Sequence, residues 1–277
     1  MEDRAALEAA VAVARAHGLE VVDPVILRDQ LNVLVHLRPA PVVARVAGTI
    51  TRARRGTTWQ ERELSVCGHL ARAGAPVVAP SAELPPGPHV HEGRVLSFWN
   101  YVPPAGDVDA AAAGEALAHC HEALRTYKGS LPLLGTLTEA EALLSRLAAE
   151  ETIDPGTATE LLLRIHELTP MLSELRSPVQ PLHGDAHLGN VLGGPLWNDW
   201  EDTCLGPVGW DAACLLAGRH GRERQEAAYA ASRMGVDPGE LELWIEARSL
   251  QVSIWRYVVT GTTLPSGSTG VRGDTRM

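Results

Sequence analysis

The order of two hydrophobic periodicities constrains this 277-residue chain more than any other feature of its sequence. Between residues 22 and 101, short β-branched runs alternate with turn residues, a pattern typical of antiparallel strands. From residue 109 onward, Leu and Ala recur at helical spacing instead. The segment Pro103-Pro104-Ala105-Gly106 separates the two regions and is typical of a linker. We therefore expect an α+β protein with a small N-terminal sheet lobe and a larger, mostly helical C-terminal lobe.

The same periodicities predict the individual elements and the lobe boundaries. The N-terminal lobe, residues 1–103, is expected to contain helices at 2–17 and 58–73 and strands at 25–27, 32–37, 42–47, 77–78 and 94–101. The C-terminal lobe, residues 104–262, is expected to contain helices near 109–126, 138–150, 155–176, 209–219, 222–234 and 238–260. Residues 263–277 are rich in Gly, Ser and Thr and are predicted to be a disordered tail.

Charge and composition exclude several classes of protein. The formal net charge of −10, from 34 acidic and 24 basic residues, argues against a nucleic-acid partner, which would need clustered Lys and Arg. No apolar run approaches the length of about 20 residues that a membrane helix needs, and the N-terminus has no signal-peptide pattern. The four cysteines show no CxxC spacing. We expect a cytoplasmic protein with reduced thiols and no membrane partner, either a monomer or a homodimer.

One compact segment carries the elements of metal-assisted phosphoryl transfer. It reads His-Gly-Asp-Ala-His-Leu-Gly-Asn from His183 to Asn190, and Asn-Asp-Trp-Glu follows at 198–201. Phosphoryl transfer needs one carboxylate to accept or orient a hydroxyl proton, and an amide oxygen with a second carboxylate to hold Mg²⁺. The Asp and Asn of the protein-kinase catalytic loop stand five residues apart, as Asp185 and Asn190 do here. Residues 191–197 predict a tight hairpin that leads to the second carboxylate, Asp199.

The segment resembles the aminoglycoside phosphotransferase and choline kinase group of small-molecule phosphotransferases. The signature of that group is His-Gly-Asp-x-His-x-x-Asn, then Asp-Trp/Phe-Glu, then Gly-Pro-x-x-Trp-Asp. The last piece stands here as Gly206-Pro207-Val208-Gly209-Trp210-Asp211. The resemblance covers about residues 20–260. It implies a bilobal, protein-kinase-like fold that transfers the γ-phosphate of ATP or GTP to a hydroxyl of a small molecule.

The resemblance also implies roles for the residues of the C-terminal lobe. Asp185 is expected to be the catalytic base, and Asn190 and Asp199 are expected to be ligands of Mg²⁺, with two ions bound. The supporting residues are expected to be His183 and Asp211, which would brace the catalytic loop. For His187, both a phosphate contact and a structural hydrogen bond are open.

The N-terminal lobe is expected to hold the nucleotide. Kinase-like folds use a cation on the third strand, oriented by a helix acid, to grip the phosphates. The only lysine, Lys128, lies in the other lobe, so we expect Arg45 to supply this charge and Glu63, rather than Glu61, to orient it. An exposed strand arginine is the simpler alternative for Arg45.

Two segments flank this expected nucleotide site. The phosphate-covering loop should lie at 28–32, where Asn32 matches an asparagine common after such loops, but the loop contains no glycine. The lobe connection resembles a hinge that binds a purine edge through the backbone of Asn100 and Val102. Trp99 and Phe98 in that connection are either part of it or ordinary core aromatics.

The acceptor is identified only as a small molecule, an aminoglycoside, another antibiotic, an amino alcohol or a sugar. Acidic and tryptophan side chains would suit a cationic acceptor through ion pairs and cation–π contacts. Candidate contacts are Glu201, Asp202, Trp244 and Glu246. A solvated acidic helix face with core tryptophans is the competing interpretation of the last two.

Two other functions compete with this hypothesis. The glycine-free loop is compatible with an inactive, nucleotide-binding kinase-like protein. The His-Gly-Asp-x-His motif, together with His89 and His91, could also belong to a metallophosphoesterase. That class needs an earlier Asp-x-His and a later Gly-Asn-His, and neither occurs. The two histidines lie in a Pro/Gly-rich stretch that we expect to be an exposed loop.

Overall fold

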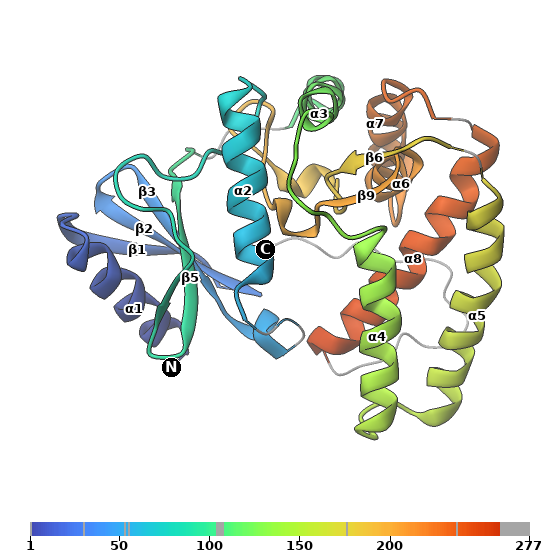
Figure 1. The fold of residues 1–277 in the computed structure, drawn as a ribbon, viewed down its shortest axis with the longest axis horizontal. Helices are drawn as coiled ribbons and strands as arrows, with labels where there is room; N and C mark the ends of the chain where they lie inside the picture. Colours follow the sequence, from blue (N-terminus) through green and yellow to red (C-terminus); the bar gives the residue numbers. More distant parts are fainter. Residues whose placement is uncertain are drawn as a thin grey trace.

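The computed structural model describes residues 2–29, 31–52, 54, 56–103, 108–175, 177–236 and 238–260. It shows the expected two-lobed α+β, kinase-like architecture, with an antiparallel sheet at one end and a helical lobe at the other (Figure 1). The predicted disordered tail, 263–277, and most of the Pro103–Gly106 linker lie outside the described residues. Among the described residues, no helix is both long and apolar enough to cross a bilayer.

The N-terminal sheet contains five antiparallel strands in the order β1-β2-β3-β5-β4. The strands are β1 (Val21–Asp29), β2 (Asn32–Pro39), β3 (Val42–Ala47), β4 (His89–His91) and β5 (Arg94–Asn100), and helix α1 (Glu2–Ala16) covers one face (Figure 1). Alternation along β3 buries Val42, Ala44 and Val46 against α1. The same alternation turns Arg45 to the opposite face, toward the C-terminal lobe.

Strand β4 corrects one expectation. The Pro/Gly-rich composition around His89 and His91 predicted an exposed loop, but both residues belong to an edge strand paired with β5. The His89 ring packs near His17 and Phe98, and its Nε2 lies 2.8 Å from the carbonyl oxygen of Pro85. Pairing with a neighbouring strand has therefore outweighed local turn composition, and these histidines belong to the sheet edge.

Helix α2 (Thr58–Arg72) joins the two lobes through its packing. Its buried apolar residues, Val66, Cys67 and Leu70, belong to the core of the C-terminal lobe, whereas the sheet and α1 form a separate core. From β5, Trp99 also reaches the larger core, while Phe98 stays in the smaller one. Both aromatics are thus core residues. The helix stands between sheet and helical lobe in Figure 1, and it carries Glu63 to their junction.

The C-terminal lobe is built from six helices and two short antiparallel strand pairs among the described residues. Its helices are α3 (Ala110–Leu124), α4 (Gly135–Ala149), α5 (Pro155–Glu174), α6 (Gly209–Leu216), α7 (Gly221–Ser232) and α8 (Pro238–Thr260). Its strand pairs are β6 (Val179–Leu182) with β9 (Cys204–Pro207), and β7 (Val191–Leu192) with β8 (Leu196–Trp197). Three 3₁₀ turns, η1 (Thr49–Arg52), η2 (Leu188–Asn190) and η3 (Trp200–Asp202), complete the description of the chain.

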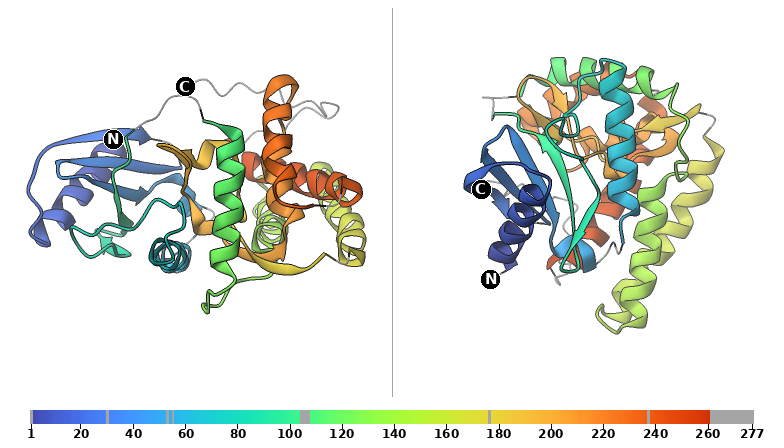
Figure 2. Two further views of the ribbon diagram at one scale, coloured as in Figure 1. Left: turned by 90° about the horizontal axis from the view of Figure 1, so that it is seen from above. Right: turned by 60° about the vertical axis from the view of Figure 1, so that its left-hand side comes forward.

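Helix α8 lies across the lobe and packs on α4, α5 and α6 (Figures 1 and 2). Four fully buried tryptophans fill the core that these helices enclose, namely Trp197, Trp200, Trp210 and Trp244. Three of them follow or flank the catalytic segment. The loop that carries the polar site residues therefore packs on a buried, apolar core.

Replacing Gly114 with alanine tests the closest approach of α3 to α7. A Cβ atom at this position would lie 2.7 Å from the Cα and carbonyl oxygen of Ala230. We expect Gly114→Ala to lower the free energy of unfolding by about 1–3 kcal/mol, because the helices must move apart. The matched control is Gly68→Ala in α2, where nothing lies within 4 Å and stability should rise by about 0.5–1 kcal/mol. Urea unfolding measures the free energy of unfolding of both variants. Equal changes in the two variants would contradict this close packing of α3 and α7.

Candidate active site

Asp211 anchors the catalytic loop to helix α6. Its carboxylate accepts hydrogen bonds from the backbone N–H of His183 at 2.8 Å and of Gly184 at 2.9 Å. The ring of His121, on α3, lies 2.8 Å from the same carboxylate. Burial alone would raise the pKa of Asp211, but the bond and charge of His121, followed by the other donors, hold it below its usual value. A carboxylate that stays ionised thus fixes the start of the loop.

His183 is a buried structural residue of this loop. Its Nδ1 accepts the backbone N–H of Asp185 at 3.3 Å, and its Nε2 donates to the carbonyl oxygen of Asn198 at 3.0 Å. The ring also contacts Trp197 and Trp200. Burial lowers the pKa of His183 despite nearby carboxylates. The neutral tautomer with a proton on Nε2 satisfies both hydrogen bonds.

Gly184 permits the close approach of two parts of the site. Its backbone has a φ of +89°, which favours glycine, and a Cβ there would overlap the backbone of Asp202. Asp202 follows the second motif and so packs directly against the residue before Asp185. This contact brings the two sequence motifs together.

Asp185 lies between a guanidinium and an imidazole. Its Oδ1 forms an ion pair with Nη2 of Arg248 on α8, and its Oδ2 lies 3.6 Å from Nε2 of His187. Burial would raise the pKa of Asp185, but the charge of Arg248, followed by the two loop histidines, holds the pKa below its usual value. The side chain is ionised at neutral pH and remains partly exposed.

Asn190 and Asp199 have the chemistry and the placement to hold a hard cation. The side-chain Nδ2 of Asn190 donates to the carbonyl oxygen of Asp185 at 3.0 Å, which leaves its amide oxygen for a ligand. Asn198 donates from both its backbone and its side chain to the carbonyl oxygen of Asn190, so the two motifs are tied together.

Asp199 itself has a left-handed backbone, with a φ of +65°. Its Oδ1 is buried and accepts no hydrogen bond in the described structure, although Nη2 of Arg45 lies 3.0 Å away. An amide oxygen and an under-satisfied carboxylate fit Mg²⁺, with phosphates and water completing the shell. The described residues contain no cluster of three or more His, Cys, Asp or Glu suited to a metal, so the nucleotide would have to supply ligands.

Arg45 is the centre of the lobe junction. Its Nη1 donates to both carboxylate oxygens of Glu63 at 2.6 Å, and its Nη2 pairs with Glu201. With its amide oxygen turned toward the guanidinium, Asn32 accepts from Nε and Nη2 of Arg45 at 3.1 and 3.0 Å. Glu61 instead accepts from the hydroxyl of Thr57. The expected pair of Arg45 with Glu63 is therefore present, and the guanidinium is enclosed rather than exposed.

Arg54, which precedes α2, is a second buried cation that sequence reasoning did not single out. It pairs with Glu139 on α4 and with Glu201 and Asp202 on η3. Indole faces of Trp59 and Trp255 lie 5.6 and 4.8 Å from its guanidinium carbon. Burial raises the pKa of Asp202 to about 7, although the charge of Arg54 opposes this shift.

The charges at the junction do not cancel. Three guanidinium groups face six carboxylates, which leaves a formal charge of −3 (three minus six) when all are ionised. The guanidinium groups are those of Arg45, Arg54 and Arg248. The carboxylates are those of Glu63, Glu139, Asp185, Asp199, Glu201 and Asp202. Burial, followed by the charges of neighbouring carboxylates, raises the pKa of Glu63 against the pull of Arg45. A divalent cation would relieve this excess of negative charge.

Other predicted residues lie elsewhere. Trp244 is buried in the core against Trp210, so it does not form the acceptor wall that we expected. Glu246 pairs with Arg164 on α5 and is part of a helix–helix contact. The indole of Trp244 and the carboxylate of Glu246 are thus both engaged within the lobe, and we no longer regard them as acceptor contacts.

The two residues predicted to contact a purine, Asn100 and Val102, differ in their surroundings. The backbone N–H of Asn100 donates to the carbonyl oxygen of Ala79 at 3.1 Å and is not available to a purine. The side chain of Val102 packs against Gly193 of the β7–β8 hairpin. A purine could therefore contact the backbone of Asn100 only through an atom other than this N–H group.

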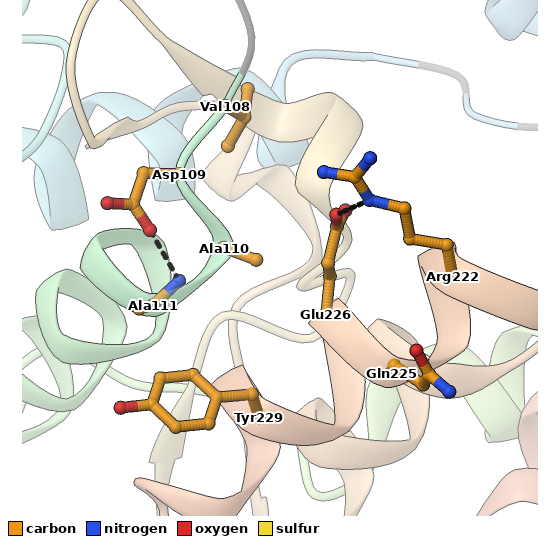
Figure 3. A pocket seen from close by; sticks show the side chains of 8 residues that line it. All are labelled: Val108, Asp109, Ala110, Ala111, Arg222, Gln225, Glu226 and Tyr229. Atoms are coloured by element: carbon orange, nitrogen blue, oxygen red, sulfur yellow. Dashed lines mark hydrogen bonds and ion pairs between the residues drawn. The ribbon is translucent and has the colours of Figure 1, made fainter.

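Two open cavities of about 430 Å³ each occur in the described structure. One lies between the start of α3 and α7, where Figure 3 shows Asp109, Glu226 and Tyr229 around it. Asp185, Asn190 and Asp199 do not line it. The other lies between α2 and α4, and its lining includes Trp59, Glu139 and Asp202. The second cavity therefore opens onto the carboxylates that hold Arg54.

The lobes and the paired motifs define a kinase-like phosphotransferase fold. The model of the phosphotransferase enzyme family (APH) matches residues 28–244, and the chain belongs to this family. This membership accounts for the His-Gly-Asp-x-His segment without the metallophosphoesterase alternative, whose other proposed ligands, His89 and His91, lie on the sheet edge.

Solved structures confirm the fold at low sequence identity. Choline kinase LicA from Streptococcus pneumoniae is 16% identical, with a TM-score of 0.66 over 91% of this chain and 90% of that one. The GDP and kanamycin complex of an APH(2″) enzyme is 13% identical, with a TM-score of 0.63 over 90% of each chain. Aminoglycoside phosphotransferase APH(3″)-Id from Streptomyces rimosus is 17% identical, with a TM-score of 0.62 over 88% of this chain and 98% of that one. No curated protein sequence matches significantly.

Replacing Asp211 with asparagine tests the anchor of the catalytic loop. Because the pKa of Asp211 is lowered on folding, its stabilisation is complete above the ordinary value of about 4 and is lost as pH falls through the folded value. We expect Asp211→Asn to lower the free energy of unfolding by about 3 kcal/mol at pH 7. The difference from wild type should shrink as the pH falls below about 4.

Urea unfolding across this pH range measures the effect. Asp23→Asn is the control, because Asp23 forms an exposed pair with Arg38 and should change stability by less than about 1 kcal/mol. Parallel stability curves for wild type and Asp211→Asn would contradict the anchoring role.

Proposed function

We propose that this protein transfers the γ-phosphate of ATP or GTP to a hydroxyl of a small molecule. The arrangement of Asp185, Asn190 and Asp199 carries this proposal. Asn190 is tied to the backbone of Asp185, and Asp199 brings a buried, under-satisfied oxygen to the same loop. A base and two hard ligands next to an arginine–glutamate pair are what metal-assisted phosphoryl transfer requires.

The proposed step needs few protein groups. The acceptor oxygen forms a bond to the γ-phosphorus while the bond to the β,γ-bridging oxygen breaks, and a nucleoside diphosphate leaves. The hydroxyl proton moves to Oδ2 of Asp185 and then to water. Mg²⁺, when bound through Asn190 and Asp199, neutralises charge on the phosphates; the number of ions, predicted as two, stays a prediction. Catalysis then comes mainly from positioning and charge neutralisation.

Nucleotide binding in this proposal uses the enclosed Arg45. Its bidentate pair with Glu63 fixes the guanidinium at the lobe junction, and Asn32 braces it. Complexes with GDP and with ADP both occur among the solved structures that the chain resembles, so ATP and GTP remain equal candidates. His187 lies beside Asp185 rather than beside Arg45, and we propose that it lines the γ-phosphate end of the site.

The acceptor in this proposal carries a positive charge. The cavity between α2 and α4 presents Glu139, Asp202 and the indole of Trp59. The guanidinium of Arg54 lies against these groups, and the excess of carboxylates at the lobe junction supports a cationic acceptor beside it. Structures named as complexes with kanamycin, streptomycin and gentamicin, and as choline kinases, are among those similar to this chain.

The setting of the reaction follows from charge and composition. A net charge of −10 gives no basis for a nucleic-acid partner, and the four cysteines are free and buried. We propose a cytoplasmic enzyme, monomeric or homodimeric, without a membrane partner.

An inactive nucleotide-binding protein is the second candidate function. The turn between β1 and β2 has no glycine to cradle phosphates. In addition, the Nε, Nη1 and Nη2 groups of Arg45 all contact protein groups in the described structure. A protein of this kind would bind Mg-nucleotide without consuming it, and a turnover assay separates the two functions.

Substitution of the two aspartates should separate chemistry from binding. We expect Asp185→Ala to lower turnover by at least about 100-fold while Mg-nucleotide affinity changes little, because Asp185 contacts the acceptor and not the metal. Asp199→Ala should instead abolish the Mg²⁺ dependence and most nucleotide affinity. Coupled nucleoside-diphosphate release and calorimetric titration measure these effects.

The control for this comparison is Asp23→Ala, which removes an exposed carboxylate from β1 and should leave both quantities unchanged. Wild-type turnover by Asp185→Ala would overturn the assignment of the base. Nucleotide binding by the wild type without turnover of any hydroxyl compound would support the inactive alternative.

A thermal-shift screen tests the charge of the acceptor. With Mg-nucleotide present, amino sugars and amino alcohols should raise the melting temperature, and their uncharged hydroxyl analogues should not. A ligand at 100 times its Kd adds about 2.7 kcal/mol to the free energy of unfolding, enough to detect. Glu139→Gln should reduce the shift, whereas Glu141→Gln, an exposed neighbour on α4, should not. Protection by neutral compounds alone would contradict a cationic acceptor.

A further inference from the structure

Helix α8 delivers a buried arginine to the catalytic carboxylate. Arg248 pairs through Nη2 with Oδ1 of Asp185, and its Nη1 donates to Oε1 of Gln251 at 2.6 Å, one turn further along the helix. Only 9% of the Arg248 side chain is exposed, against 21% for Asp185. Both α8 residues lie outside the segment that the family model matches, residues 28–244.

Burial distinguishes this pair from a surface salt bridge. An exposed pair contributes little and is easily broken, whereas a buried guanidinium must keep its partners because desolvation would otherwise be costly. Arg248 belongs to the inward face of α8, where Trp244, Ala247 and Ile254 are fully buried. Packing on this face, together with the bond to Gln251, fixes the guanidinium before any substrate binds.

The two oxygens of Asp185 are therefore not equivalent. Oδ1 is held by the guanidinium, while Oδ2 has His187 at 3.6 Å, beyond hydrogen-bond distance. A rotation of the carboxylate would break the ion pair. Oδ2 is thus the oxygen of Asp185 that is left for an acceptor hydroxyl.

We propose that Arg248 is a positioning residue, which anchors Oδ1 of Asp185 so that Oδ2 faces the acceptor hydroxyl. This inference rests on the proposed function, because it assumes that Asp185 receives the acceptor proton. The guanidinium does not touch the reacting atoms. It acts through Asp185, and Gln251 acts through Arg248.

Two substitutions at position 248 test the role. Arg248→Met removes the charge and keeps the apolar length, whereas Arg248→Lys keeps a charge and loses the planar fork. Nitrogen-15 NMR of the arginine side chains reports whether the guanidinium of Arg248 is held, with its signal assigned by its absence in Arg248→Met. This measurement needs neither acceptor nor turnover. The kinetic measurement compares kcat with the KM values for Mg-nucleotide and for the acceptor found by the screen above.

The expected result has three parts. In Asp185→Asn, the NMR signal of the Arg248 guanidinium should shift, because the charged partner of Nη2 is gone. In Arg248→Met, kcat should fall by about 10- to 100-fold, while the KM for Mg-nucleotide stays within about twofold. Arg248→Lys should restore only part of kcat. The control Arg233→Met, which removes an exposed pair between α7 and α3, should change none of these.

Several outcomes would overturn the inference. An Arg248 signal that is unchanged in Asp185→Asn would do so, as would a wild-type kcat in folded Arg248→Met. If Arg248→Met does not fold, Gln251→Leu decides: a fall in kcat at an unchanged KM for Mg-nucleotide supports the inference, and a wild-type kcat overturns it. Absence of turnover in the wild type would refute the proposed function, while the NMR comparison would still decide whether Arg248 holds Asp185.

Discussion

The structure depends on the compensation of buried carboxylates by three arginines at the junction of the lobes. Arg45 comes from the sheet, Arg54 from the segment before α2, and Arg248 from the last helix of the C-terminal lobe. Arginine suits this task because its guanidinium keeps its charge when buried and satisfies several carboxylate oxygens at once. The single lysine of the chain, Lys128, is not among them. All three guanidinium groups of the junction therefore keep their charge although they are buried.

Beneath these charges, the catalytic loop is held almost entirely by backbone contacts. Asp211 receives two backbone N–H groups, the indole of Trp210 donates to the carbonyl oxygen of Gly184 at 2.8 Å, and Asn190 ties its side chain to the carbonyl of Asp185. Such contacts fix the path of the chain and leave the Asp185 side chain to be oriented from elsewhere. Because the loop contacts leave the side chain of Asp185 free to be oriented, Arg248 on α8 can hold its carboxylate.

Local patterns predicted the elements and the centre of the site well. The helical periodicity after residue 109 located all six C-terminal helices to within a few residues, and the five-residue spacing of Asp185 and Asn190 identified the loop. The strand at His89–His91 was missed because its composition is that of a turn, and only pairing with β5 stabilises it.

Long-range contacts lay beyond such patterns. The partners of Arg54 and Arg248 are distant in sequence, and no spacing rule links them. Trp244 was misplaced for a related reason, since helical spacing cannot tell a core stripe from a binding wall. A signal for Arg248 did exist, because Trp244, Arg248, Gln251 and Trp255 recur at helical spacing, which puts two polar residues on a stripe that the core should occupy.

Helix α2 has one further consequence for the way this molecule can move. Since its apolar side belongs to the C-terminal core, the helix is mechanically part of the larger lobe, and the weaker seam runs between α2 and the sheet. Moving the sheet and α1 together away from α2 would then draw Arg45 from Glu63. The ion pair spans this seam, so its loss would accompany any such movement.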